Sequence, residues 1–206
     1  MATGLARQFA QQLACPSGRI GQWLGGAMDL ANRGPTRLAI DLLAPVAGER
    51  ILDAGCGTGA ALAQVLRRAP CHVTGIDPSP TMIAAATARL GRRADLREAG
   101  LAELPFTDGS FDAALLLNVL YFCDDEGRMI ANLRRVLRPG GRLVAYVTHR
   151  ETMEHWPFTR AGLHRLYNES ELTAALIAGG FALPGISVHP IRVTRKVRGL
   201  LAYAVR

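Results

Sequence analysis

The sequence of 206 residues predicts one α/β domain with a doubly wound, mostly parallel sheet and helices on both faces. Two observations carry this prediction. From Ile51 onward, short apolar runs of strand length alternate with stretches of helical spacing, which is the pattern of consecutive βαβ units. The composition is that of a globular protein, with 49% hydrophobic and 20% charged residues, and no apolar run reaches membrane-spanning length.

Each apolar run is bounded by turn residues or by a helical stretch, and these boundaries define the expected elements. The expected strands are residues 50–55, 71–77, a weaker stretch within 94–101, 111–118, 142–149 and two strands within 181–206. The expected helices between them are residues 60–68, 79–90, 129–137 and 169–178. The alternation of strands and helices favours a parallel sheet over most of the chain.

Local signals support three of these boundaries. Ser79 can cap the helix that follows it, and Pro80 suits the first helical position. Asn168 and Glu171 have the spacing of a capping box. The run Arg-Pro-Gly-Gly at residues 138–141 suits a type II turn before the fifth strand.

Residues 1–35 are expected to form a partly helical lid over the sheet's carboxyl edge, and residues 36–206 the core of the domain. In open α/β sheets the ligand binds beyond the carboxyl ends of the strands, where the strand order reverses. The expected ligand site therefore lies under this lid. Polar residues at or near such strand ends are Asp53, Asp77, Asn118 and His149.

The formal net charge is +7, but the basic residues are dispersed, and Lys196 is the only lysine among 24 of them. A nucleic-acid partner is therefore not expected. The four cysteines lack the spacing of a zinc site or of a disulfide framework, so neither a metal nor a disulfide is expected. The first 18 residues lack the continuous apolar region of a signal peptide, which predicts a cytoplasmic protein with reduced thiols.

A glycine-rich loop follows the first strand. Gly55, Gly57 and Ala60 satisfy the dinucleotide pattern G-x-G-x-x-G/A, and Asp77 lies about 20 residues further on, where a carboxylate meets a ribose hydroxyl. A tight strand-to-helix turn without a ligand would also need such glycines. Asp53 lies just before the loop and would repel a pyrophosphate. The combination favours a cationic nucleoside, S-adenosylmethionine.

Several motifs occur in a characteristic order: ILDAGCGTG, GIDPSPTMI, LAELPFTDGSFDAALLLNVLYF, LRRVLRPGGRLV and YNESELTAALIAGGF. With these motifs, residues 50–206 resemble the class I S-adenosylmethionine-dependent methyltransferases, especially the subgroup that acts on small molecules. The resemblance implies a Rossmann-like sheet of seven strands in the order 3-2-1-4-5-7-6, with strand 7 antiparallel. It also implies S-adenosylmethionine as the cofactor and S-adenosylhomocysteine as the product.

The resemblance assigns cofactor contacts residue by residue. The backbone of Gly55, Cys56 and Gly57 would lie against the methionine moiety, and Asp77 would bind both ribose hydroxyls. Asp53 favours the ammonium and sulfonium charges directly or through water. The carbonyl of Asn118, at the end of the fourth strand, would point toward the sulfonium, unless this residue only forms a turn.

The adenine end is less typical of the family. Pro78 and Met82 would flank the adenine ring. Family members often carry an aspartate for the adenine amino group, where this chain has Gly100 and Leu101. Backbone groups of Leu101 and Ala102 are therefore the expected partners of the adenine edge.

Methyl transfer is an in-line displacement that mainly requires alignment, so no nucleophilic side chain is expected. A hydroxyl or protonated amine as the acceptor would benefit from a general base. His149, directly after the fifth strand, is the first candidate by position and is expected to face the cleft, although a surface-loop role fits equally. Tyr121 contributes either its hydroxyl or a pocket wall.

The acceptor is expected to be a small, partly apolar molecule, attacked at O, N, C or S. Residues 118–122 lack the Asn/Asp-Pro-Pro-aromatic element of enzymes that methylate nucleic-acid bases. Two alternatives stay open: an inactive nucleoside-binding regulatory protein of the same fold, and a nicotinamide-dependent oxidoreductase. Large apolar side chains that could form walls of the cleft are Trp23, Met28, Trp156 and Phe158.

Overall fold

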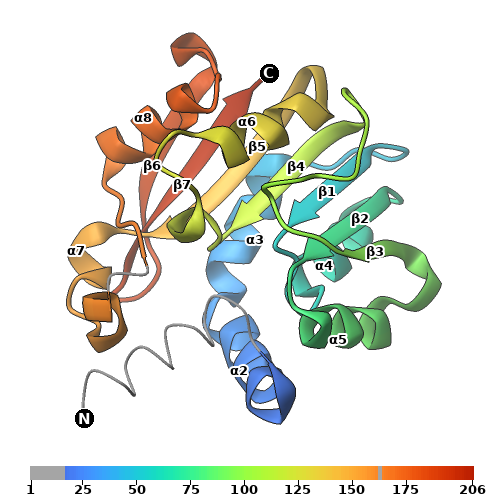
Figure 1. Ribbon diagram of the computed structural model, residues 1–206, viewed down its shortest axis with the longest axis horizontal. Helices are drawn as coiled ribbons and strands as arrows, with labels where there is room; N and C mark the ends of the chain where they lie inside the picture. The colour runs from blue at the N-terminus through green and yellow to red at the C-terminus, as the bar shows by residue number, and fades with distance from the viewer. Residues whose placement is uncertain (1–16, 162–163) are drawn as a thin grey trace.

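The computed structural model describes residues 17–161 and 164–206, and seven strands within these ranges form one sheet in the order β3-β2-β1-β4-β5-β7-β6 (Figure 1). The strands are β1 Arg50–Ala54, β2 His72–Asp77, β3 Ala94–Glu98, β4 Phe111–Leu117, β5 Leu137–Thr148, β6 Ile186–Arg192 and β7 Arg198–Val205. β7 pairs antiparallel with β5 and β6, whereas the pairs among β1 to β5 are parallel. The expected strand order and the antiparallel β7 are confirmed.

The position of each strand in the sheet explains its sequence. β1 and β4 are neighbours near the centre, with Ile51 paired to Ala113, and both strands are largely buried. Central parallel strands covered on both faces need continuous apolar runs, which these two strands have. β3 lies at the edge of the sheet and is mostly exposed, and its apolar signal is correspondingly weak.

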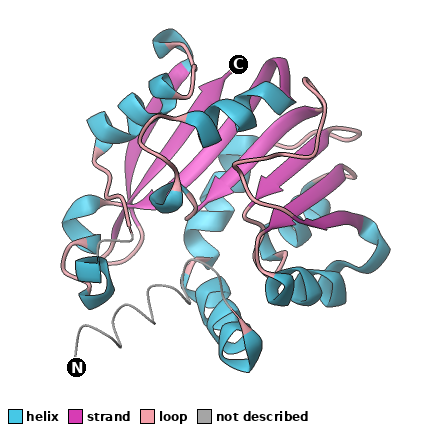
Figure 2. Ribbon diagram, in the orientation of Figure 1, coloured by secondary structure: helices cyan, strands magenta, loops and turns pink. Residues whose placement is uncertain are grey.

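Helices cover both faces of the sheet (Figure 2). One buried cluster joins the sheet to α6 and α8, and the other joins it to α3, α4 and the end of α5. The doubly wound architecture is therefore confirmed. The α-helices are α2 Gly18–Ala31, α3 Arg33–Leu43, α4 Ala60–Arg68, α5 Pro80–Leu90, α6 Arg128–Val136, α7 Arg150–Met153 and α8 Glu169–Ala178, and the 3₁₀-helices are η1 Gly91–Arg93, η2 Leu120–Phe122, η3 Pro157–Ala161 and η4 Leu183–Gly185.

Two helix starts follow the expected capping chemistry. The Ser79 hydroxyl accepts a hydrogen bond from the Met82 N–H at 3.2 Å, and Pro80 opens α5. Asn168 and Glu171 form the complete capping box of α8, with both backbone-to-side-chain bonds present at 2.9 and 2.8 Å. Caps of this kind typically stabilise a helix by about 1 kcal/mol.

The run at residues 138–141 differs from its expectation. These residues lie inside β5, where the register with β4 shifts between Phe111 and Ala113, so they form an irregularity of the strand and not a separate turn. Gly140 has a φ of +75°, which glycine adopts without strain. Two backbone hydrogen bonds with Arg206, the residue after β7, keep this segment in the sheet. The Gly140 N–H donates to the Arg206 carbonyl, and the Arg206 N–H donates to the Gly141 carbonyl.

The N-terminal segment is helical where it is described. α2 packs against α5 and lies beyond the carboxyl ends of the central strands (Figure 1). Residues 1–16 of the expected lid, including Cys15, lie outside the described residues. None of the described helices is long and apolar enough to cross a membrane.

Candidate active site

A cavity of about 330 Å³ opens at the carboxyl ends of β1, β2 and β4. Its walls come from the loop after β1, the start of α5, the segment after β3 and the end of β4. The structure thus brings together every residue that the sequence assigned to the cofactor. These are Asp53, Gly55, Cys56, Gly57, Asp77, Pro78, Met82, Leu101, Ala102 and Asn118.

The glycine loop owes its shape to its backbone. The N–H groups of Gly55 and Cys56 both donate to the Ile76 carbonyl at 2.8 Å, which holds the loop against the end of β2. Gly55 has a φ of +87°, and a Cβ there would lie 2.3 Å from Cγ2 of Val119. Gly57 has a φ of +51° but open space around it, because its missing side chain faces the cavity. The loop therefore brings bare backbone to the ligand.

Asp77 organises the same loop. Its Oδ2 accepts a hydrogen bond from the Gly57 N–H, and its Oδ1 accepts one from the Ser79 N–H, each at 2.9 Å. Burial raises the pKa of this carboxyl group, and the two backbone bonds oppose that rise. A carboxylate oxygen has two lone pairs, so each Asp77 oxygen can still accept a bond from a ribose hydroxyl.

Asp53 is the second buried acid of the cavity, with only 1% of its surface exposed. Its Oδ1 has no hydrogen-bond partner among the described residues. Burial, and then the charge of Asp77, raises the pKa of Asp53 to about 7. A buried carboxylate without a partner is costly unless a cation or a donor comes to it.

The charges of the cavity decide which ligand fits. Among the described residues, its lining contains Asp29, Asp53 and Asp77 but no Arg, Lys or His side chain. A pyrophosphate would therefore meet carboxylates and no cation, whereas the ammonium and sulfonium of S-adenosylmethionine would meet the unpartnered oxygen of Asp53. The residues present fit S-adenosylmethionine, and they disfavour a dinucleotide.

The adenine end contains a residue that the sequence did not point out. Nδ2 of Asn132, on α6, donates to the Ala102 carbonyl at 2.6 Å and to the Leu101 carbonyl at 3.4 Å. These bonds fix the segment after β3, which lines the cavity as Met82 does. No sequence signal joins Asn132 to positions about 30 residues earlier, because α6 has no motif of its own there.

The described part of the expected lid also lines the cavity, through residues of α2 and the start of α3. Thr58 Oγ1 donates to Asp29 Oδ2 at 2.6 Å, and Arg89 donates to both side chains, at 2.5 Å to Thr58 and 2.8 Å to Asp29. The helix also approaches closely at Gly25, where a Cβ would lie 3.0 Å from the Thr58 methyl group. The α2 and α3 residues in the lining are Gly25, Met28, Asp29, Asn32 and Thr36.

Of the four large apolar side chains expected to form walls of the cleft, one lines the cavity and three do not. Met28 lines the cavity, whereas Trp23 is 75% exposed on α2 and does not. Trp156 and Phe158 pack against each other, with ring centroids 5.5 Å apart, and neither side chain lines the cavity. They belong to the edge of the core cluster that contains α6 and α8.

Tyr121 does not line the cofactor cavity, and its hydroxyl is already engaged. It donates to Asn118 Oδ1 at 3.1 Å and accepts a hydrogen bond from the Thr148 N–H. Burial raises the pKa of Tyr121 well above its usual range. The side chain therefore positions Asn118, which has a φ of +60°, and a proton-transfer role for Tyr121 lacks geometric support.

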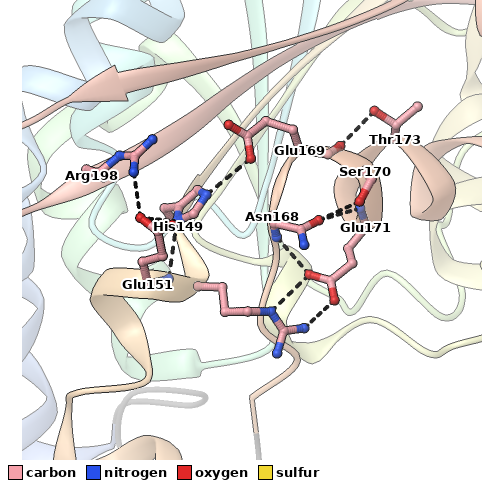
Figure 3. Close-up of polar contacts among 9 residues, drawn as sticks. His149, Glu151, Asn168, Glu169, Ser170, Glu171, Thr173 and Arg198 are labelled. Carbon is pink, nitrogen blue, oxygen red and sulfur yellow. Dashed lines mark hydrogen bonds and ion pairs between the residues drawn. The ribbon is translucent and has the colours of Figure 1, made fainter.

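His149 also lies outside the cavity lining, so its expected orientation toward the cleft is wrong. Its imidazole lies instead between Glu151 and Glu169 (Figure 3). Its Nδ1 accepts a hydrogen bond from the Glu151 N–H at 3.2 Å, which makes it the cap of α7. Its Nε2 lies 3.2 Å from Oε2 of Glu169. Arg198 holds Glu151 at 2.5 Å, so the imidazole is enclosed in a network between β5, β7 and α8. A catalytic role for His149 stays a prediction without geometric support.

The described cysteines, Cys56, Cys71 and Cys123, are free and buried. Cys56 lines the cavity, and burial, with the charges of Asp53 and Asp77, raises the pKa of its thiol far above neutrality. The thiol is therefore protonated and not a nucleophile. Within the described ranges, no group of three or more His, Cys, Asp or Glu side chains is placed to hold a metal ion.

Comparisons with known proteins agree with this geometry. Residues 52–145 match the family model described as a methyltransferase domain. An O-methyltransferase of Aspergillus nomiae is 36% identical over 121 residues, which is 56% of this chain and 54% of the relative. A demethylmenaquinone methyltransferase of Tropheryma whipplei is 41% identical over 109 residues, or 52% of this chain and 45% of the relative. The chain thus spans about half the length of these relatives.

A solved structure extends the likeness to the whole fold. The 1,6-didemethyltoxoflavin-N1-methyltransferase of Burkholderia thailandensis, with 1,6-didemethyltoxoflavin and S-adenosylhomocysteine bound, superposes with a TM-score of 0.71 and 22% identity. The match covers 100% of this chain and 88% of that structure. Sequence match, strand order and site geometry thus agree: residues 52–145 belong to the methyltransferase-domain family, and the described chain has the fold of the class I S-adenosylmethionine-dependent methyltransferases.

Proposed function

We propose that this protein binds S-adenosylmethionine in the cavity and transfers its methyl group to a small molecule. The observation that carries the proposal is the unpartnered, fully buried oxygen of Asp53 in a cavity whose described lining contains no basic side chain. When bound, S-adenosylmethionine supplies an electrophilic methyl group on a sulfonium. The negative charge of Asp53 favours the cationic end of this ligand.

The chain contributes alignment and exclusion of water. Asp77 holds the ribose and the glycine loop together, and the bond from Tyr121 fixes the side chain of Asn118 at the end of β4. Alignment of two reactants is worth roughly 7 to 11 kcal/mol, so no nucleophilic side chain is required. α2, tied to the glycine loop through Asp29 and Thr58, would act as the cover of the cofactor, with residues 1–35 as the lid and 36–206 as the catalytic core.

The proposed acceptor is a small, partly apolar molecule. Apolar side chains from the end of β4, from η2 and from the start of α6 line the cavity together with Asn118: Leu117, Val119, Phe122 and Met129. The compared proteins carry names that refer to methylation at oxygen, of demethylmenaquinone and at a ring nitrogen, so they support a small acceptor without fixing the attacked atom.

The first test is calorimetric titration of the purified protein with S-adenosylmethionine, S-adenosylhomocysteine and NADH, with Asp77→Ala as the control. We expect the two sulfur nucleosides to bind, NADH to fail, and the variant to lose binding. Binding of NADH alone would return the site to a nicotinamide-dependent oxidoreductase. Absence of binding by all three would contradict the proposed function.

A second measurement separates the enzyme from an inactive regulatory protein of the same fold. The protein is incubated with S-adenosylmethionine and a panel of phenols, quinols and amines, and the S-adenosylhomocysteine formed is quantified. We expect acceptor-dependent formation of S-adenosylhomocysteine that disappears in Asp77→Ala. Tight binding of the cofactor without product for any acceptor class would favour the regulatory protein.

A further inference from the structure

The cavity extends along the carboxyl ends of four neighbouring strands, and its chemistry changes from one end to the other. The strands lie in the order β4, β1, β2 and β3. Asn118 follows β4, Asp53 lies in β1, and Asp77 ends β2. Residues 99–102, directly after β3, close the far end of the cavity. The acids at the strand ends thus lie on one side, and the segment after β3 lies on the other.

The order of these groups sets the direction of a bound nucleoside. In S-adenosylmethionine, the ribose lies between the sulfonium and the base. With the cationic end at Asp53 and the ribose at Asp77, the base would extend toward β3, because β2 lies between β1 and β3 in the sheet. The wall at that end of the cavity consists of Pro78, Met82, Ala99, Gly100, Leu101 and Ala102.

This wall, called here the base wall, contains no polar side chain, since its six residues are apolar or glycine. The three acids of the described lining, Asp29, Asp53 and Asp77, belong to α2, β1 and β2. Glu98 and Glu103 flank the segment after β3, but neither lines the cavity. Hydrogen bonds from the base wall to a purine are therefore limited to its backbone groups.

The backbone of the base wall does not favour one purine over another. The carbonyls of Leu101 and Ala102 already accept bonds from Nδ2 of Asn132, at 3.4 and 2.6 Å. The N–H groups of Leu101 and Ala102 donate to no described residue. An N–H donor can pair with a ring nitrogen of adenine or with the 6-oxo oxygen of hypoxanthine, whereas the 6-amino group of adenine needs an acceptor.

Gly100 leaves room in the base wall for a side chain that the chain does not have. A Cβ at this position would have no heavy atom within 4 Å apart from those of its chain neighbours. Gly100 is also not among the glycines of positive φ, so its backbone conformation suits other residues. A side-chain acceptor for the 6-amino group could therefore be accommodated here without strain.

We propose that the cofactor site selects weakly at position 6 of the purine, and that Gly100 sets this weak selectivity. The proposal rests on the proposed function, since it concerns the nucleoside bound in that same site. A site built to hydrogen-bond one group of a substrate rejects the analogue without it by about 10⁴- to 10⁵-fold, whereas an apolar pocket rejects an isostere by only about 10²-fold or less. The base wall is of the second kind.

The first experiment compares two ligands that differ only at this position. Wild-type protein is titrated calorimetrically with S-adenosylhomocysteine and with S-inosylhomocysteine, in which an oxo group replaces the 6-amino group. We expect the two dissociation constants to lie within about 10-fold of each other. A larger preference for S-adenosylhomocysteine would overturn the proposal.

A ribose analogue provides the internal comparison. S-(2′-deoxyadenosyl)homocysteine lacks one hydroxyl that the carboxylate of Asp77 would bind, and bonds to a charged group are the stronger ones. We expect its affinity to fall by about 10- to 100-fold, which is more than the change of base causes. A change of base that costs as much as the lost hydroxyl would contradict weak selectivity at the base wall.

Two variants of Gly100 test the residue itself. Gly100→Asp supplies a carboxylate that accepts from the 6-amino group and repels a 6-oxo oxygen. We expect its preference for S-adenosylhomocysteine over S-inosylhomocysteine to exceed that of the wild type by about 10- to 100-fold. Gly100→Ala adds the Cβ alone and should keep the wild-type ratio. The ratio is the readout, because a general distortion of the site would weaken both ligands alike.

The failures are distinguishable. Wild-type protein that binds neither nucleoside would contradict the proposed function itself. Tight binding of S-adenosylhomocysteine with strong rejection of S-inosylhomocysteine would contradict only the weak selectivity. An unchanged ratio in Gly100→Asp, with S-adenosylhomocysteine still bound, would contradict the assignment of the selectivity to Gly100.

Discussion

The two sides of the sheet's carboxyl edge are built differently. On the cofactor side, residues 53–60 and 76–82, every assigned residue lines the cavity. On the acceptor side, at the ends of β4 and β5, the two candidate catalytic side chains, His149 and Tyr121, lie outside it. The cofactor side works mainly through backbone groups and the strand-end carboxylates, whereas the acceptor side depends on where side chains point. Side-chain direction is set by distant contacts, and a local motif does not contain it.

The largest expected effect tests the cofactor side directly. In Asp77→Ala, the loop loses its bond from Gly57, and the ribose loses its partner. Hydrogen bonds to a charged group are each worth about 1.5 to 3 kcal/mol, so affinity for S-adenosylhomocysteine should fall by about 100-fold or more. Calorimetry measures the loss, with Asp77→Asn expected to be intermediate because it keeps one acceptor oxygen. Unchanged affinity in Asp77→Ala would show that this strand-end carboxylate does not bind the cofactor, which would contradict the description of the cofactor side.

A pair of glycine variants tests whether backbone shape is what this side requires. Gly55→Ala adds a Cβ 2.3 Å from Val119 at a φ of +87°, whereas Gly57→Ala adds one in open space at a φ of +51°. Strain and overpacking each cost about 1 to 3 kcal/mol, so urea denaturation should show about 3 kcal/mol of destabilisation for Gly55→Ala and about 1 kcal/mol for Gly57→Ala. Gly57→Ala should instead weaken cofactor binding. The reverse order of stabilities would contradict this account of the loop.

Asp53 predicts a pH dependence of the ligand-free protein. Its pKa is about 7 in the folded state and near the ordinary value in the unfolded state. Between these values the unfolded state ionises first, so the contribution of Asp53 to stability is fully present below the unfolded pKa and is lost as pH rises toward 7. The fall between pH 5 and pH 7 should be on the order of 2 kcal/mol.

Asp53→Asn should flatten this profile in thermal or urea denaturation, because the amide does not titrate. Asp108→Asn, whose side chain is 70% exposed, is the matched control and should leave the profile in place. S-adenosylmethionine should also bind more tightly as pH rises through about 7, since its cationic end favours the ionised carboxyl group. A profile of Asp53→Asn identical to the wild type would show that this acid is not the titrating group.

More of the fold than of the site can be predicted from the sequence, because the signals for helices and strands are local and the contacts of side chains in the site are not. Alternating apolar runs and caps such as Ser79 are local, so they marked the elements correctly. The residues at 138–141 predict a turn by themselves, whereas the pairing with Arg206 that keeps them in β5 involves the far end of the chain. Asn132 has no signal in the sequence because its bonds to the carbonyls of Leu101 and Ala102 join positions about 30 residues apart and exist only in the folded chain.

α2 is the part of the cofactor side that the sequence left least defined, and its contact with the loop gives the smallest expected effect. Thr58→Val keeps the shape of the side chain but removes the hydroxyl between Asp29 and Arg89, whereas Thr58→Ser keeps the hydroxyl and removes the methyl group beside Gly25. Partly exposed polar contacts of this kind are worth about 0.5 to 1 kcal/mol, so Thr58→Val should weaken binding of S-adenosylhomocysteine by about 2- to 5-fold. A larger loss in Thr58→Ser than in Thr58→Val would assign the attachment of α2 to packing at Gly25. Side-chain contacts, and not only loop backbone, would then shape both sides of the carboxyl edge.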